Sequence, residues 1–287
     1  MKRFEKIKHL LMTVLVFLIS TVLMTGCGSK SSTGVDDTVT EGRFLDGPVE
    51  GLSYVAGSES GITDAQGRFT YSTGATVKFN IGDILIGEGT AQTTMTPVNL
   101  VQGAINEEDP TVINITRFLL TLDADGNPDN GITITEAMRN YGVGKSINFN
   151  QGITAFQNDV NVKNIIEGMT NGARSLVSSQ EAQDHMNQTL LGILAGTYKG
   201  TYSGDNAGTW TVEVSSSGNI AGTGVSNTHG SFTLQGTVNS SGSMDCSGEI
   251  AMFGVTFVGY VNSSTGEVSG TWTSVTGDNG TYSGNKQ

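Results

Sequence analysis

The chain has few cysteines and histidines, and this scarcity excludes several kinds of site. Its 287 residues include two cysteines, Cys27 and Cys246, and three histidines. Two cysteines cannot build a zinc site on their own. No C-x-x-C-H segment is present, which excludes covalent attachment of haem. We therefore expect no metal chemistry that depends on thiolates.

Basic residues are also scarce. The sequence carries 15 lysines and arginines against 27 aspartates and glutamates. Nucleic-acid binding depends on lysine and arginine contacts to phosphates, so no nucleic-acid partner is expected. A basic face that docks on an anionic membrane is not expected either. The acidity fits an exported protein, or one that binds cations.

Long apolar runs are limited to the N-terminal segment. Four basic residues lie within Met1–Lys8, and the apolar run Leu10–Met24 follows. This run has the length of a signal-peptide core and is short for a membrane-spanning helix. Met24–Cys27 then reads Met-Thr-Gly-Cys and resembles the lipobox of bacterial lipoproteins. The alternative is an ordinary N-terminal membrane anchor.

The resemblance implies removal of residues 1–26 and a covalent lipid, such as palmitate, on Cys27. Cleavage would leave 11 basic and 26 acidic residues, a net charge of −15, and Cys246 without a disulfide partner. Residues 27–41 are rich in Ser, Thr and Gly and are predicted to form a flexible tether. By resemblance to lipoprotein sorting, Gly28 favours the outer membrane over the inner. We expect a lipid-anchored protein of the bacterial envelope or cell surface.

Residues 42–191 are predicted to form a β-rich module followed by a helical segment. Val77, Phe79 and Ile81 alternate as in a half-buried strand. The stretch Gly61–Tyr71 contains a G-x-T-D-x-x-G-x-F hairpin in which Asp64–Gly67 forms the turn. It resembles the carboxypeptidase-regulatory-like, prealbumin-like modules of bacterial surface proteins. That resemblance implies a stalk or presentation module.

Two helices are predicted in the second part of this module. Asp109-Pro110 is a helix start, because Asp caps free N–H groups and Pro suits the first helical position. Ser178 and Glu181 have the spacing of a capping box at a second start. Each start precedes an apolar stripe, and between them Gly142–Gly172 is predicted to mix loop and helix. The stripes are Val112, Ile115, Phe118, Leu119 and Leu122, and then Ala182, Met186, Leu190 and Ile193.

Residues 192–287 are predicted to form an antiparallel meander β-barrel of about eight strands. Trp210, Val212 and Val214 share one strand face, and turn signals recur every eight to fourteen residues. The runs 200–204 and 280–284 are both Gly-Thr-Tyr-Ser-Gly. We expect these two runs to pair and close the barrel, because closure removes both exposed sheet edges. The fold class is thus mainly β with a helical insert.

The segment Asp125–Glu136 resembles the calcium loop of an EF-hand. Oxygen-bearing groups recur at the spacing that surrounds one calcium ion. The expected ligands are Asp125, Asn127, Asp129, Gly131 through its carbonyl, Thr133 and Glu136. Pro128 and the non-glycine residue Asn130 depart from the pattern. The alternative is a loop whose acidic residues only form turns.

No catalytic constellation stands out in the sequence. Glu107–Asp109 is interpreted as charge at a helix start, Asp184-His185 lacks a nucleophile, and His229 lies in a predicted turn without an evident partner. Asp245 is expected to raise the pKa of Cys246 and to disfavour a reactive thiolate.

We therefore expect a non-enzymatic envelope lipoprotein that binds or scaffolds an envelope or extracellular protein or glycan. One alternative is a barrel that binds a small apolar molecule or glycan, with Trp210 and Trp272 lining its pocket rather than filling its core. A second alternative is an enzyme of unknown type. A cavity of several hundred Å³ with convergent polar groups would favour the ligand-binding barrel.

Overall fold

The computed structural model describes residues 38–250 and 253–287, and side chains in these ranges except those of Ile250 and Phe253. The predicted signal peptide, the lipid site Cys27 and nearly all of the tether lie outside the described residues. None of the described helices is long and apolar enough to cross a membrane.

The β-rich module forms two small antiparallel-rich sheets and one two-stranded pair. The sheet orders are β4-β3-β6-β7, β5-β1-β8 and β2-β9. The strands are β1 (Val39–Phe44), β2 (Val49–Glu50), β3 (Ser53–Ala56), β4 (Glu59–Ile62), β5 (Arg68–Ser72), β6 (Thr76–Ile81), β7 (Ile84–Thr90), β8 (Thr94–Met95) and β9 (Ile132–Thr133). Rings of Phe44, Phe69 and Phe79 meet in the core at centroid distances of 4.6 and 5.1 Å. The predicted Asp64–Gly67 turn is present, with Gly67 N–H donating to the Asp64 carbonyl at 2.8 Å.

The helical part contains α2 (Pro110–Leu122), α3 (Glu136–Tyr141), α4 (Ile153–Asn158), α5 (Val160–Thr170) and α6 (Ser179–Leu194), with short 3₁₀ turns at Pro97–Leu100 and Pro128–Asn130. Both predicted caps form: the Asp109 carboxylate accepts from the N–H of Thr111 and Val112, and the Ser178 hydroxyl accepts from that of Glu181. Gly142–Gly172 mixes loop and helix, as predicted.

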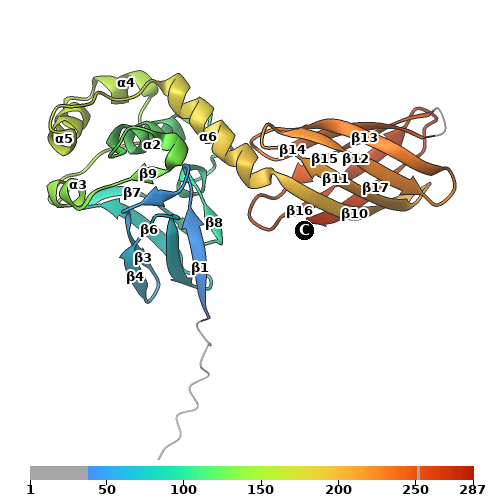
Figure 1. The fold of residues 1–287 in the computed structure, drawn as a ribbon, viewed down its shortest axis with the longest axis horizontal. Coiled ribbons are helices and arrows are strands. Elements are labelled where there is room, and N and C mark those ends of the chain that lie inside the picture. The colour runs from blue at the N-terminus through green and yellow to red at the C-terminus, as the bar shows by residue number, and fades with distance from the viewer. Residues whose placement is uncertain (1–37, 251–252) are drawn as a thin grey trace, which may run out of the picture. The chain divides into compact units, whose positions relative to one another are not determined.

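Two details of the helices differ from the sequence prediction. α2 is buried from Val112 to Leu122 on all sides, not along one stripe, and Figure 1 shows other elements around it. Its polar side chains bond inside the module; the Asn114 amide, for example, donates to the carbonyls of Phe149 and Gln151. At the end of α6, Leu194 is buried and Ile193 is only half-buried, because Leu194 packs into the core of the barrel.

The C-terminal part is a closed barrel of eight antiparallel strands, each bonded to its neighbours along the chain (Figure 1). The strands are β10 (Gly196–Gly204), β11 (Gly208–Val214), β12 (Asn219–Ser226), β13 (Gly230–Val238), β14 (Ser243–Ile250), β15 (Phe253–Val261), β16 (Glu267–Ser274) and β17 (Asn279–Lys286). Side chains alternate between the interior and the surface, most regularly in β11. The predicted meander barrel and the mainly β fold class are confirmed.

The barrel closes through the two identical runs. β10 pairs with β17 so that Gly200 lies opposite Gly284 and Tyr202 opposite Tyr282. The seam is tightly packed: a Cβ added to Gly280 would overlap the Ser203 carbonyl and touch the Trp272 indole. Glycine is therefore required at this position of the β10–β17 pair, because a methyl group would force the two strands apart.

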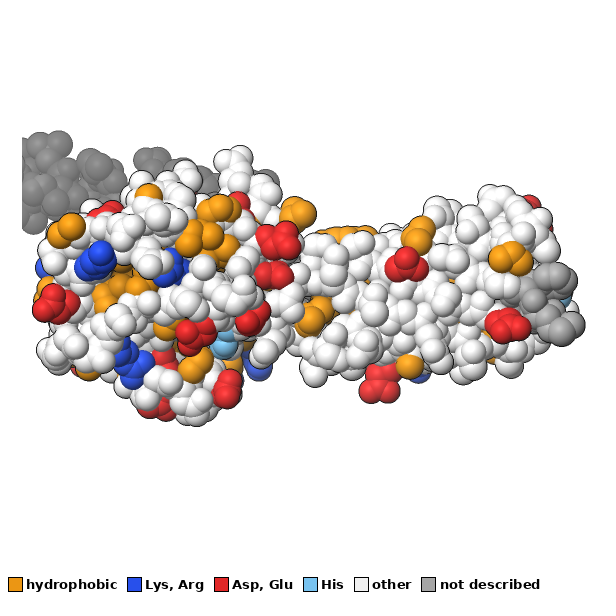
Figure 2. Space-filling model, turned by 90° about the horizontal axis from the view of Figure 1, so that it is seen from above, with side chains coloured by type: hydrophobic (Ala, Val, Ile, Leu, Met, Phe, Trp, Pro, Cys, Tyr) orange, Lys and Arg blue, Asp and Glu red, His pale blue; other side chains and the backbone are white. Residues whose placement is uncertain are grey.

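One end of the barrel is closed by its own chain. The Tyr198 hydroxyl donates to the Leu194 carbonyl at 2.7 Å, and the Leu194 side chain belongs to the barrel core. The outer surface is mostly small and polar, with acidic side chains scattered on the face seen in Figure 2. The larger apolar side chains exposed on the described part of the barrel lie on β12, on β15 and in the β16–β17 connection: Val225, Val258, Tyr260 and Val275.

Candidate functional site

The opposite end of the barrel holds a cavity of about 330 Å³. The connections after β10, β12 and β16 lie at this end, because consecutive antiparallel strands turn alternately at the two ends. The lining residues come from three strands (β10, β15 and β16) and three connections. They are Tyr202, Asn206, His229, Val255, Phe257, Trp272, Ser274, Thr276 and Asp278.

Aromatic and aliphatic side chains form the inner wall of the cavity. The Tyr202 ring meets the rings of Phe257 and Trp272 edge to face, with centroids 6.0 and 5.7 Å apart. The Trp272 indole N–H donates to the Ser203 carbonyl at 3.0 Å, which fixes the ring against the seam. All three rings are buried, and Val255 adds an aliphatic surface. The wall is therefore apolar and rigid, as in small-molecule pockets.

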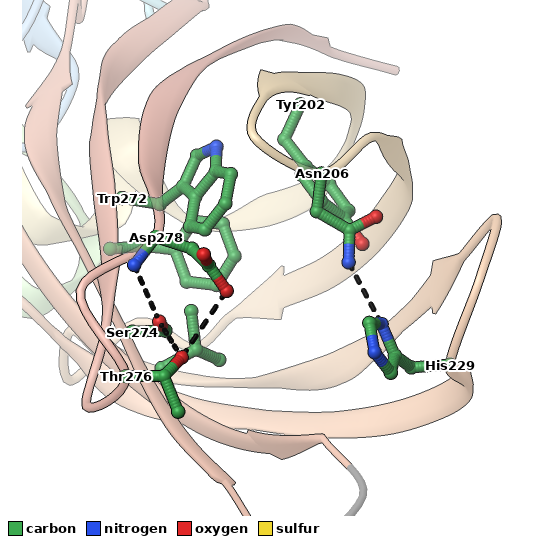
Figure 3. A pocket seen from close by; sticks show the side chains of 9 residues that line it. Tyr202, Asn206, His229, Trp272, Ser274, Thr276 and Asp278 are labelled. Carbon is green, nitrogen blue, oxygen red and sulfur yellow. Dashed lines mark hydrogen bonds between the residues drawn. The ribbon is translucent and has the colours of Figure 1, made fainter.

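One side of the mouth is formed by an amide and an imidazole (Figure 3). Asn206 Nδ2 lies 2.9 Å from His229 Nδ1, and the Thr228 hydroxyl lies 2.7 Å from the same nitrogen. The Ser226 hydroxyl accepts from the His229 backbone N–H at 3.0 Å. These bonds join the β10–β11 connection to the β12–β13 connection and hold the imidazole at the mouth.

The other side of the mouth is a chain of hydroxyls that ends on a carboxylate. The hydroxyls of Ser274 and Thr276 are 2.7 Å apart, and Thr276 donates to Asp278 Oδ2 at 3.2 Å. Asp278 N–H donates back to the Ser274 hydroxyl at 3.1 Å. The β16–β17 connection thus places one carboxylate and two hydroxyls at the mouth in a fixed arrangement.

The Tyr202 hydroxyl is the unusual polar group of the cavity. The side chain is 3% exposed, and the hydroxyl makes no hydrogen bond among the described residues. Burial raises the pKa of Tyr202, an effect that the neighbouring Ser226 hydroxyl partly offsets without reaching hydrogen-bond geometry. A buried polar group without a partner costs about 1–3 kcal/mol of stability, so this hydroxyl, which is itself buried, destabilises the folded barrel.

Beyond the cavity the barrel is filled. Trp210, Leu234, Cys246 and Tyr282 surround a void of only about 10 Å³. Burial, and then the nearby Asp245 carboxylate, raise the pKa of Cys246 to about 12. The predicted effect of Asp245 is present but is the smaller of the two causes, because the sequence does not reveal how deeply the thiol is buried.

The sequence left open whether the two tryptophans line a pocket or fill the barrel core, and the structure shows one in each place. Trp272 lines the cavity, whereas Trp210 packs in the filled half with its ring 6.1 Å from that of Tyr282. The Trp210 indole N–H is bonded to the Thr201 carbonyl at 3.2 Å. One tryptophan therefore belongs to a pocket and the other to the core.

The predicted calcium loop lies between α2 and α3, on the exposed surface. Asp125 accepts from Asn127 N–H at 2.9 Å through Oδ1 and from the Asn130 amide at 2.9 Å through Oδ2. These bonds lower the pKa of Asp125. Asn127, which precedes Pro128, lies outside the α region, with φ of −122° and ψ of 81°.

The remaining predicted ligands are spread along the segment after Asp125. Asp129 and Glu136 are exposed, and the positive φ of 104° falls on Gly131 rather than on Asn130. Thr133 pairs with Glu50 in the β2–β9 ladder. Among the described residues, no three Asp, Glu, His or Cys side chains are placed to hold a metal, so the loop does not gather its carboxylates in this structure.

The other sequence candidates have structural contacts. Glu107 Oε1 accepts from the Asn187 amide at 2.7 Å. His185 Nε2 lies 2.9 Å from the Asp46 carbonyl and 3.4 Å from its carboxylate. Asp46 is completely buried, and burial raises the pKa of its carboxyl well above the usual range. The sequence did not single out Asp46, because nothing near it in the chain marks it as buried.

No protein-family model and no curated protein matches the chain. Two solved structures of redesigned β-barrels are similar to 34% of it. One is 15% identical and is matched over 95% of its length. The other, mFAP1 bound to DFHBI, is 16% identical and is matched over 98% of its length. The TM-score is 0.28 in both cases.

Proposed function

We propose that this protein is an envelope lipoprotein whose C-terminal barrel binds a small molecule with an apolar, ring-shaped body. The observation that carries the proposal is the cavity of about 330 Å³ with an aromatic inner wall and polar groups confined to its mouth. Ligand pockets have volumes of about 300–1,000 Å³ and combine apolar walls with a few fixed polar groups. A barrel built only as a scaffold has no need of an unfilled half.

The polar mouth favours binding over catalysis. The Ser274 and Thr276 hydroxyls are engaged with each other and with Asp278. His229, the imidazole at the mouth, is engaged with Asn206 and Thr228 on the other side. Nucleophilic catalysis requires a hydroxyl bonded to its base. The hydroxyls that line the cavity, Ser274 and Thr276, are bonded on the other side of the mouth from His229, and Thr228, which is bonded to the imidazole, does not line the cavity. We therefore assign the mouth to ligand orientation.

The anchoring part of the proposal depends on the N-terminal segment. The lipobox-like Met24–Cys27 would attach a lipid to Cys27, and the Ser-, Thr- and Gly-rich tether would separate the fold from the membrane. Gly28 favours the outer membrane. Such a protein would hold its ligand at the envelope without crossing the bilayer through its described helices.

The test of binding uses prodan, a neutral dye whose emission shifts to the blue in apolar surroundings. We expect saturable, one-to-one enhancement with the purified chain. Val255→Phe would fill the cavity and abolish the enhancement, while Val258→Phe, on the outer surface, would retain it. The folded state of each variant is checked by its circular dichroism. Absence of prodan binding, or equal binding by the folded Val255→Phe variant, would refute the proposal.

A further inference from the structure

We infer that the barrel cavity selects an organic cation: a flat or ring-shaped apolar body that carries a protonated nitrogen. The inference rests on the proposed binding function and names the chemical class of its ligand. It follows from the charges at the mouth and from the aromatic wall of the cavity.

The charged groups of the barrel are divided between its two ends. The cavity end carries three carboxylates, Asp205, Glu249 and Asp278, and no lysine or arginine. The two residues that connect β14 to β15 are Ala and Met and add no charge. Both basic residues of the barrel lie toward the other end, where Lys199 pairs with Asn285 and Lys286 pairs with Tyr198.

This division disfavours an anionic ligand. A carboxylate or phosphate at the mouth would approach three like charges and find no ammonium or guanidinium group to replace its water. A cation would meet the opposite field, which also concentrates it at the mouth before it enters. The charge pattern therefore separates ligand classes that an apolar cavity alone would accept equally.

Asp278 is positioned to receive the charged end of such a ligand. It lines the cavity, and Thr276 holds its carboxylate by a 3.2 Å hydrogen bond. Asp205, by contrast, accepts from the Asn279 backbone and side chain at 3.0 and 3.1 Å and ties two connections together. The two acids thus differ in role: Asp205 braces the mouth and Asp278 faces the cavity.

The aromatic wall supplies independent support for the same class. Indole and phenol faces attract cations, tryptophan most strongly, and the Trp272 N–H is already bonded to Ser203, so its ring system is what lines the cavity.

The test uses three probes of nearly equal shape that differ in charge: 2-naphthylmethylamine, 2-naphthalenemethanol and 2-naphthoate. Binding is measured by calorimetry at pH 7, where the first is a cation, the second neutral and the third an anion. We expect the cation to bind most tightly and the anion least. Replacing the carboxylate with Asp278→Asn should weaken cation binding by about three- to tenfold, since the side chain is exposed to screening, and leave the neutral probe unchanged.

Two controls make the outcome decisive. Asp245→Asn removes an exposed acid outside the mouth and should leave all three affinities unchanged. Higher salt should reduce the preference for the cation. Equal affinity for the three probes, tighter binding of the anion, or an unchanged cation affinity in Asp278→Asn would overturn the inference. If prodan binds but none of the naphthalene probes does, the cation inference fails while the proposed function stands.

Discussion

Three buried tyrosines in the barrel make it possible to measure what an unpartnered hydroxyl costs. Tyr198, Tyr202 and Tyr282 are 2, 3 and 3% exposed, so their surroundings are matched in burial. The Tyr198 hydroxyl is bonded to the Leu194 carbonyl, whereas those of Tyr202 and Tyr282 have no partner among the described residues. The same substitution should therefore have opposite effects on stability.

Tyr202→Phe should stabilise the protein. The variant keeps the ring and its edge-to-face contacts and removes only the desolvated hydroxyl. Relief of an unsatisfied buried group is worth about 1 kcal/mol or more, so we expect the free energy of unfolding to rise by about 1 kcal/mol. Tyr282→Phe should behave in the same way. Tyr198→Phe should lower the free energy of unfolding by about 1–2 kcal/mol, because it also leaves the Leu194 carbonyl buried without its donor.

Urea unfolding followed by tryptophan fluorescence measures these changes. Both tryptophans of the chain lie in the barrel, so the signal reports on the barrel itself. With a urea m-value of about 1–2 kcal/mol/M, a change of 1 kcal/mol moves the midpoint by about 0.5–1 M. If Tyr202→Phe and Tyr282→Phe lower the midpoint as far as Tyr198→Phe does, the two hydroxyls have hydrogen-bond partners and the prediction is wrong.

Four further predictions follow. Gly280→Ala should force the barrel seam apart and cost about 1–3 kcal/mol in urea unfolding, whereas Gly192→Ala, in open space on α6, should stabilise by about 0.5–1 kcal/mol. The pKa of Asp46 is raised in the folded state, so the free energy of unfolding falls as the pH rises above the ordinary carboxyl pKa. Asp46→Asn should therefore raise the melting temperature at pH 7. This gain should vanish below about pH 4, where the carboxyl is protonated in both the folded and the unfolded state. Millimolar calcium should raise the melting temperature if the predicted loop binds it, and an equal shift in Glu136→Gln would refute that site. Cys27→Ala should abolish lipidation, and an unmodified Cys27 in the mature envelope protein, detected by mass spectrometry, would contradict the lipobox interpretation.

The barrel could be predicted from the sequence because its determinants are local. Alternation in segments such as Trp210–Val214 sets the faces of a strand, and regularly spaced turns set the meander. Closure followed from the identical runs in β10 and β17. The helix starts at Asp109 and Ser178 could also be predicted from the sequence, since a cap is defined by residues two or three positions apart.

The cavity could not be predicted, because it depends on which side chains leave space after the barrel has closed. Asn206, His229 and Asp278 are far apart in the chain, and each lies in a connection that resembles an ordinary turn. Only the strand pairing brings their connections to the same mouth. The complete burial of α2 was missed for a related reason, since Asn114 and Arg117 suggest an exposed face until their carbonyl partners from distant loops are known.

The seam between β10 and β17 has a consequence for how the protein assembles. Seven pairs of neighbouring strands form hairpins with short connections, but the eighth pair joins residues about eighty positions apart, and such long-range contacts form slowly. Until it forms, β10 and β17 are free edges with the same Gly-Thr-Tyr-Ser-Gly run. In a concentrated refolding mixture, β17 of one copy can therefore reach β10 of another first, and the result would be a domain-swapped dimer that dilution during refolding suppresses.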